Sequence, residues 1–116
     1  MDIDAKMLSE PVKEIFDYYN IDWNDSNREQ FAIFLQALQL FNERNKRYRD
    51  QWKETGWRGA LYDIVKKGRR LFTQFRLATA APEATDDDAW DMINFCAFYL
   101  RAKQDGNEWG IWGEIK

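Results

Sequence analysis

The sequence predicts an all-α fold, a compact bundle of about four helices followed by an irregular tail rich in Trp and Gly. Strand patterns are nearly absent, because no segment alternates apolar and polar residues for long and β-branched residues are sparse. Apolar residues recur instead at spacings of three and four, between residues that start and stop helices. The length of 116 residues suits a single helical domain over residues 1–116.

The first two expected helices lie in the N-terminal half of the chain. Ser9 can cap a short helix, Pro11 is tolerated in its first turn, and the segment continues to about Tyr19. Before a longer second helix, Ser26 and Glu29 have the spacing of a capping box. We expect this helix to run to about residue 53 and to stop before the glycine at position 56. Its apolar stripe consists of Phe31, Phe34, Leu35, Leu38 and Phe41.

A third helix is expected from about residue 59 to residue 77. Its expected inward face consists of Leu61, Ile64, Val65, Leu71, Phe72 and Phe75. Gly68 lies inside this helix and costs about 1 kcal/mol relative to alanine, so we expect close packing or a bend as the reason for it. Residues 78–85, which include Pro82, are expected to form a linker.

The fourth expected helix begins after this linker. Thr85 and the three aspartates that follow supply a cap and negative charge for its start, and it should end before Asp105. Its apolar residues are Trp90, Ile93, Ala97 and Leu100 on one face, with Phe95, Phe98 and Tyr99 widening it. So wide a surface suits a central helix or an oligomer interface. In the Gly-rich tail, Trp109 and Trp112 are expected to fold back on the body or to dock on a neighbouring subunit.

Composition excludes several classes of protein. The chain contains no His, which removes Ser-His-Asp and Cys-His catalysis and zinc sites that use His. Its single Cys, Cys96, cannot form an internal disulfide and is expected to be a small buried residue among apolar neighbours. The polar, acidic start is unlike a signal peptide, and no apolar run approaches the roughly 18–20 residues of a membrane helix. We therefore expect a cytoplasmic protein with no membrane partner.

Charge is segregated along the chain although the net charge is only −3. Residues 44–70 contain ten Lys or Arg and three acids, whereas the rest contains seven basic and seventeen acidic residues. One interpretation is a solvated basic face that acidic neighbours balance, and the other is a phosphate-binding surface. The overall pI near 5 argues against duplex nucleic acid as the ligand.

Oxygen ligands for Mg²⁺ could come from the fourth helix. Asp88, Asp91 and Asn94 follow one another at spacings of three and share a helical face. Carboxylates and amide oxygens suit Mg²⁺ when substrate phosphates complete its coordination. Acids in a first turn are also ordinary partners of the helix dipole, and this alternative applies to Asp86 and Asp87.

The second helix carries further candidates in its last turns. Glu43 and Lys46 could form an intrahelical ion pair, or could bind a metal ion and a phosphate. Tyr48 and Trp52 are four residues apart, which would place them on one helical face. Aromatic residues at this spacing are either core residues or a platform on which a base stacks.

These segments together resemble the nucleotide modification associated domain family, which occurs in phages and bacteria. The family pattern is K-N-K-D-Y-G-x-x-W, a G-x-R-G turn, an R-L helix and a late D-x-x-N helix. The matching residues are Asn45, Lys46, Tyr48, Trp52, Gly56, Arg58, Gly59, Arg70, Leu71, Asp91 and Asn94. The resemblance covers about residues 41–101, half of the chain. The family is similar to MazG-like all-α pyrophosphohydrolases, which use Mg²⁺ to cleave nucleoside triphosphates into a monophosphate and pyrophosphate.

The resemblance implies roles for individual residues. Asp88 and Asp91 would stand for an E-x-x-D pair and Glu43 for part of an acidic cluster, so the three would bind Mg²⁺ and act in catalysis. The implied substrate-binding residues are Lys46, Tyr48, Trp52, Arg69, Arg70 and Asn94. The chain departs from the pattern at Arg49, where the family tends to have Gly, and at Lys66, where it has an acid. A cation in place of an oxygen ligand disfavours a second Mg²⁺.

Two functions from different classes follow from the sequence. The first is a nucleotide-binding helical domain of the MazG-like type, either an Mg²⁺-dependent nucleoside triphosphate pyrophosphohydrolase or a degenerate nucleotide binder. The second is a small phage-type module that binds a protein partner through its basic face and its Trp tail. A homo-oligomer fits both, because short helices with wide apolar surfaces pair readily. A phage-encoded member would act in the host cytoplasm.

Overall fold

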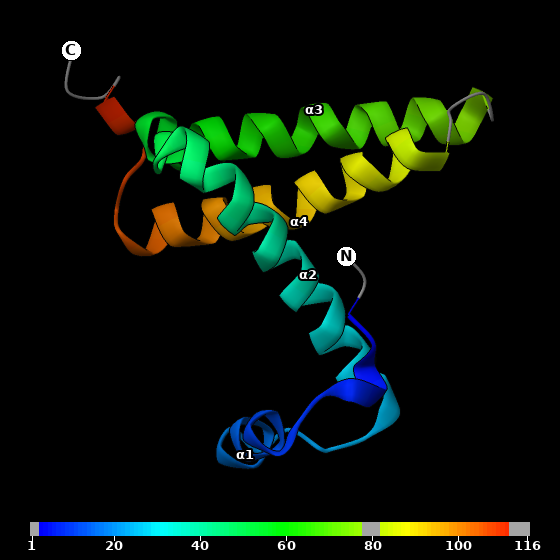
Figure 1. The fold of residues 1–116 in the computed structure, drawn as a ribbon. Helices are drawn as coiled ribbons and strands as arrows, with labels where there is room; N and C mark the ends of the chain where they lie inside the picture. The colour runs from blue at the N-terminus through cyan, green and yellow to red at the C-terminus, as the bar shows by residue number, and fades with distance from the viewer. Residues whose placement is uncertain (1–2, 78–81, 112–116) are drawn as a thin grey trace. The chain divides into compact units, whose positions relative to one another are not determined.

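The computed structural model describes residues 3–77 and 82–111, and the prediction of an all-α fold is confirmed (Figure 1). The described residues form four α-helices and two short 3₁₀ helices, and they contain no strand. Contacts divide the chain into two compact units, Met1–Asn42 and Glu43–Lys116, named unit 1 and unit 2 below. In the described part of the chain no helix is long and apolar enough to span a bilayer.

Unit 1 is held together by a small aromatic core. It contains η1 (Ala5–Met7), α1 (Glu10–Tyr18) and the first part of α2 (Asp25–Tyr48). Phe16 is 2% exposed, and its ring meets Trp23 and Phe31 edge-on at centroid distances of 5.0 and 5.3 Å. Such pairs contribute about 0.5–1.5 kcal/mol beyond the apolar area that they bury. The predicted start of α1, with Ser9 at the N-cap and Pro11 in the first turn, is confirmed.

The predicted start of α2 is wrong by a few residues. The backbone N–H of Asn27 donates to the side-chain oxygen of Asn24 at 2.8 Å, so Asn24 caps the helix in place of Ser26. Asn is as good an N-cap as Ser. Asn24 immediately follows Trp23, whose ring packs on Phe16 in the core of unit 1. The helix therefore begins next to a residue that tertiary packing fixes in place.

The predicted end of α2 is also wrong, because the helix stops at Tyr48 rather than near residue 53. Arg49 and Asp50 have φ values of 47° and 60°, in the left-handed region, which ends the helix without a glycine. The side chain of Asn45 holds this turn, donating to the Asp50 carboxylate and accepting from the Asp50 backbone N–H, both at 2.8 Å. A 3₁₀ helix, η2 (Gln51–Thr55), follows the turn.

Unit 2 is built on two long helices, α3 (Gly56–Leu77) and α4 (Pro82–Gln104). They lie side by side and run in opposite directions (Figure 1). The predicted cap at Thr85 is wrong, because α4 begins at Pro82, whose missing N–H costs nothing in a first turn. The expected linker therefore shortens, and its residues 78–81 lie outside the described part of the chain. The predicted end of α4 before Asp105 is confirmed.

The predicted inward face of α3 is largely wrong. Leu61, Val65, Phe72 and Phe75 are 41–82% exposed. The residues turned inward at helical spacing are Ala60, Ile64, Lys67, Leu71 and Gln74. Lys67 and Gln74 both bind Asp88 of α4. The packed face is therefore centred one residue away from the apolar stripe, about 100° around the helix, because it carries polar side chains that pair across the two helices.

The predicted apolar surface of α4 is wrong in part, because Trp90 and Ile93 are half-buried but other residues of it are exposed. Asp88, Asn94 and Ala102 are buried, whereas Ala97 is exposed and Leu100 is 57% exposed. Cys96 is exposed as well, so the prediction of a small buried Cys is wrong. Close packing does not explain Gly68 of α3, because a Cβ there would meet no atom within 4 Å.

The described part of the tail folds back on the start of α3. Of the two predicted alternatives, this is the tail that packs on the body of its own chain. The backbone N–H groups of Trp57 and Arg58 donate to the carbonyls of Asn107 and Glu108 at 2.8 and 3.1 Å. These bonds satisfy donors at the start of α3 that have no partner within the helix. Trp112 lies outside the described residues.

Candidate functional site

A cluster of paired charges lies between α3 and α4. The ammonium nitrogen of Lys67 is 3.0 Å from Asp88 Oδ1 and also 3.0 Å from Asp91 Oδ2. Asp88 is further bound by Gln74 Nε2 at 3.2 Å and by Arg70 Nε at 3.4 Å, while Arg44 of α2 pairs with Asp91. The Asp88 side chain is only 3% exposed, which makes these contacts necessary for a stable charge.

The pairing sets the protonation states of the cluster. Burial by itself raises the pKa of the Asp88 carboxyl, but the hydrogen bond and charge of Lys67 and the charge of Arg70 outweigh burial, so the pKa lies below its usual range. Burial likewise opposes the charge of Lys67, and its bonds to Asp88 and Asp91 outweigh it and raise the Lys67 pKa. At neutral pH both Asp88 and Lys67 are therefore charged.

The charge network does not fit a magnesium site as it stands. Asp88 and Asp91 do share a face, as the sequence predicts, but the Lys67 ammonium lies between their carboxylates, where a bridging metal ion would bind. Glu43, the third expected ligand, forms an ion pair with Lys46 at 3.1 Å. In the part of the chain that the structure describes, no three His, Cys, Asp or Glu side chains are grouped to hold a metal ion. A cation is already supplied by the protein itself.

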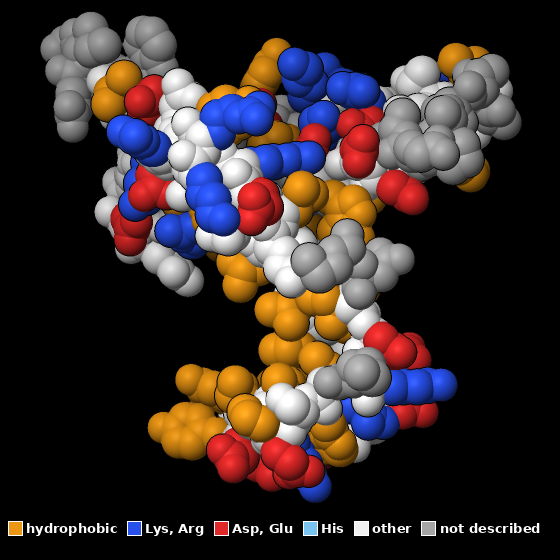
Figure 2. All heavy atoms as spheres, viewed as in Figure 1, with side chains coloured by type: hydrophobic (Ala, Val, Ile, Leu, Met, Phe, Trp, Pro, Cys, Tyr) orange, Lys and Arg blue, Asp and Glu red, His pale blue; other side chains and the backbone are white. Residues whose placement is uncertain are grey.

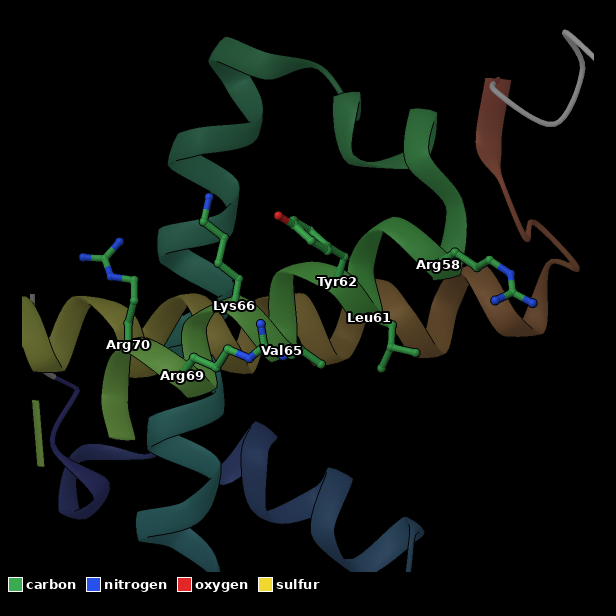
Figure 3. Close-up of a pocket in the computed structure, with 7 residues that line it drawn as sticks. All are labelled: Arg58, Leu61, Tyr62, Val65, Lys66, Arg69 and Arg70. Carbon is green, nitrogen blue, oxygen red and sulfur yellow. The ribbon is translucent and has the colours of Figure 1, made fainter. Parts of the chain in front are cut away.

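Basic side chains gather over α3 and the end of α2 (Figure 2). On α3 they line an open pocket of about 580 Å³, whose lining residues are Arg58, Leu61, Tyr62, Val65, Lys66, Arg69 and Arg70. Two rows of side chains form most of it: Tyr62, Lys66 and Arg70 project from one side of α3, and Leu61, Val65 and Arg69 from the next, while the Arg58 side chain extends toward the tail (Figure 3). Residues four apart lie above one another on a helix, which explains both rows.

The pocket combines four cations with an apolar surface and no acid. Tyr62 is 67% exposed, and Leu61 and Val65 are 41% and 45% exposed. The ion pairs found among the described residues include neither Lys66 nor Arg69. These two cations are therefore available to an anionic ligand, and the tyrosine ring beside them is available for stacking.

A second, smaller pocket of about 330 Å³ lies at the end of α2. Its lining residues are Glu43, Arg44, Arg47 and Tyr48. Tyr48 is 53% exposed here, whereas Lys46 is paired with Glu43. The structure therefore separates the expected substrate residues: Arg69 and Arg70 line the α3 pocket, and Tyr48 lines the smaller one beside Glu43, an expected metal ligand.

Trp52 and Asn94 lie in the interior of unit 2. Trp52 belongs to η2 and Tyr48 ends α2, so the prediction that they share one helical face is wrong. The Trp52 ring stacks on Phe98 at 4.7 Å, and the Arg101 guanidinium lies 4.4 Å from its centre. Asn94 is 9% exposed. Of the two interpretations of Trp52, the core residue is the one that the contacts support.

Sequence reasoning missed Lys67 and Tyr62. Both lie in the basic segment that the charge count singles out. Lys67 follows Lys66 directly, and only the pairing of α3 with α4 distinguishes the half-buried Lys67 from the exposed Lys66. Tyr62 could have been found from its spacing, because it lies four residues before Lys66 and eight before Arg70. No protein-family model, curated protein or solved structure matches the chain.

Proposed function

We propose that unit 2 binds a phosphorylated nucleotide at the α3 pocket and that binding needs no Mg²⁺. One observation carries the proposal: four cations, of which Lys66 and Arg69 are in no ion pair found among the described residues, and an exposed tyrosine line one pocket whose lining includes no acid. The family resemblance of residues 41–101 to nucleotide-directed proteins points in the same direction. Of the two forms predicted from the sequence, this is the nucleotide binder without efficient turnover.

The phosphates would bind at the end of the pocket where Lys66, Arg69 and Arg70 lie. These residues span four positions, or about 6 Å along the helix axis, so their charges are concentrated on one turn. An arginine fork matches phosphate oxygens with two parallel hydrogen bonds. Arg70 keeps a long contact of 3.4 Å with Asp88, which leaves its terminal nitrogens for a ligand.

The base would bind at the apolar middle of the pocket. Tyr62 lies one turn before Lys66 and projects from the same side of α3 (Figure 3). Leu61 and Val65 supply apolar surface beside it. Stacking of a base on an aromatic ring contributes about 1–3 kcal/mol and tolerates any base, so this arrangement favours nucleotides as a class.

The charge network supports binding without hydrolysis. The pyrophosphohydrolase chemistry that the resemblance implies uses carboxylates to hold Mg²⁺ and activate a water. Asp88 and Asp91 already share the Lys67 ammonium at 3.0 Å, so a metal ion would have to displace a half-buried cation. Lys66, which replaces an acid of the family pattern, lines the α3 pocket and adds to its phosphate affinity.

Thermal unfolding in the presence of ATP, with and without Mg²⁺, tests the proposal. A ligand at 100 times its dissociation constant stabilises the fold by about 2.7 kcal/mol, and we expect the same shift with EDTA as with Mg²⁺. Arg69→Ala should weaken ATP binding about tenfold in calorimetry, since a charged hydrogen bond is lost. Arg76→Ala is the matched control, because it removes the same charge from α3 outside the pocket.

Two results would contradict the proposal. Equal losses in Arg69→Ala and Arg76→Ala would mean that net charge, and not the pocket, attracts the nucleotide. A shift that appears only with Mg²⁺, together with pyrophosphate release, would favour the hydrolase that the sequence predicts and would require Lys67 to leave the carboxylates.

A protein partner is the second candidate function. Phe72, Phe75 and Leu77 near the end of α3 are 60%, 82% and 60% exposed, which is unusual for residues of this size. An acidic partner could cover them together with the basic pocket. Binding of a partner that Arg69→Ala abolishes, with no effect of any nucleotide, would favour this candidate. Sedimentation analysis tests the predicted homo-oligomer separately.

A further inference from the structure

The described tail is clamped onto the start of α3 by contacts that leave no spare space. Asn107 Nδ2 donates to the Lys53 carbonyl at 3.0 Å, and the Gly110 backbone N–H donates to Asn107 Oδ1 at 2.7 Å. A Cβ at Gly110 would lie 1.9 Å from the Glu54 carbonyl oxygen, and one at Gly56 would lie 2.5 Å from that of Glu108. Only glycine permits this approach, so the position of Glu108 is fixed by backbone packing.

This clamp places Glu108 against Arg58, a residue that lines the α3 pocket. Glu108 Oε1 accepts a hydrogen bond from Arg58 Nε at 2.7 Å. The Arg58 guanidinium also lies 4.6 Å from the ring centre of Trp57 and 4.8 Å from that of Trp109. Figure 3 shows the guanidinium turned toward the tail and away from Arg69 and Arg70.

Arg58 is far enough from the other cations to change which ligand the pocket prefers. It precedes Lys66 by eight residues, about 12 Å along the helix axis, whereas Lys66, Arg69 and Arg70 lie within about 6 Å. The three close cations suit the phosphates of a single nucleotide. A ligand with phosphates distributed along its length could also reach Arg58, provided that Glu108 did not already neutralise it.

We propose that Glu108 is a specificity-determining residue that withdraws Arg58 and so limits the α3 pocket to mononucleotides. Without the Glu108 carboxylate, the Arg58 guanidinium at that end of the pocket is no longer neutralised, and the pocket accepts a short single-stranded oligonucleotide with one more phosphate contact. The inference rests on the proposed function, because it assigns a substrate class to the same pocket. The tail thus selects the ligand through the ion pair of Glu108 with Arg58 at one end of the α3 pocket.

The test compares the Glu108→Gln variant with wild type for two ligands, ATP and a four-nucleotide single-stranded DNA. We expect ATP affinity to change less than about twofold and DNA affinity to rise about fivefold at low salt, the upper range for one exposed charge contact. The slope of log K against log salt for the DNA should steepen by about 0.7, because one more phosphate is neutralised. The Gln keeps the side-chain shape, and the backbone clamp does not involve its carboxylate.

Two further variants separate the ion pair from general charge. Asp105→Asn changes the net charge equally at an exposed residue outside the pocket, and should leave the slope unchanged. Adding Arg58→Ala to Glu108→Gln should cancel the gain in DNA affinity. An equal gain in Asp105→Asn, or a gain that survives the loss of Arg58, overturns the inference.

The outcomes also separate the inference from the proposed function. If wild type binds ATP and Glu108→Gln shows an unchanged DNA slope, the inference is rejected and the nucleotide pocket stands. If neither chain binds ATP or DNA, both the inference and the proposed function are rejected.

Discussion

Replacing Lys67 with Met tests whether the charge network holds α3 and α4 together. The substitution keeps an unbranched side chain, one heavy atom shorter than lysine, and removes the ammonium that lies 3.0 Å from both carboxylates. Asp88, at 3% exposure, would then be a buried carboxylate supported by Gln74 and by Arg70 at 3.4 Å. Breaking a buried ion pair on one side costs about 3–5 kcal/mol, and these remaining partners place the expected loss near the lower end, about 3 kcal/mol at pH 7.

The loss should depend on pH in a direction that the structure fixes. The folded-state pKa of Asp88 is depressed, so its stabilisation is present above the unfolded pKa of about 3.9 and is lost as the pH falls through the folded value. The raised Lys67 pKa acts in the other window, where stability is lost only as the pH rises above about 10.4. The difference between wild type and Lys67→Met should therefore shrink as the pH is lowered from 7 to 3.

Urea denaturation measures this difference directly. Five of the six tryptophans lie in unit 2, so tryptophan fluorescence reports mainly on that unit. With a slope of about 1.5 kcal/mol/M, a loss of about 3 kcal/mol lowers the midpoint by roughly 2 M. Lys66→Met is the matched control, because Lys66 is exposed and its loss should stay within about 0.5 kcal/mol. A loss below 1 kcal/mol, or one that is equal at pH 7 and pH 3, would refute the reasoning.

Three further substitutions test the local structure through urea midpoints. Arg49→Gly should stabilise the chain by about 1 kcal/mol, since φ is 47° there; a loss would mean that the arginine side chain has a stabilising contact. Gly68→Ala should add up to about 1 kcal/mol in a helix with open space around the Cβ, and destabilisation would reveal hidden crowding. Asn45→Ala removes both bonds to Asp50 and should cost about 1–2 kcal/mol; an unchanged midpoint would show that the turn does not need them.

Helices could be predicted from the sequence because their signals are local. Ser9 and Pro11 start α1, and the residues after Gln104 end α4, as capping and turn chemistry require. The boundaries that failed depend on other interactions. The end of α2 depends on two hydrogen bonds between the Asn45 side chain and Asp50. The predicted end relied instead on a glycine as the stop signal.

The helix faces could not be predicted, because apolar periodicity locates the packed face only when that face is apolar. Lys67 and Gln74 point inward in α3, since Asp88 of α4 binds both of them. A pattern search assigns such residues to solvent and shifts the expected face onto Leu61, Phe72 and Phe75, which are exposed. Residues that stabilise each other across two helices carry no signal in either helix alone.

In the candidate site, too, the types of residue could be predicted from the sequence, whereas their partners could not. The local excess of positive charge predicts a phosphate-binding surface within residues 44–70, and two residues of that segment, Arg69 and Arg70, line the α3 pocket. Glu43, Asp88 and Asp91 could be recognised as acids at helical spacing, but their partners could not. Glu43 forms an ion pair with Lys46, and Asp88 and Asp91 both pair with Lys67. Whether a carboxylate is open to a metal ion depends on the cation that folding brings beside it.

The sequence by itself determined the helical class, the segregation of charge and some of the helix ends, because each depends on residues within a few positions of one another. Tertiary structure decided which face of α3 is buried, which acids are neutralised and where the tail binds. These depend on pairs such as Lys67 with Asp88, 21 positions apart, and Arg58 with Glu108, 50 positions apart. Burial makes unpaired charges costly, so the fold settles on the arrangement in which those distant charges meet.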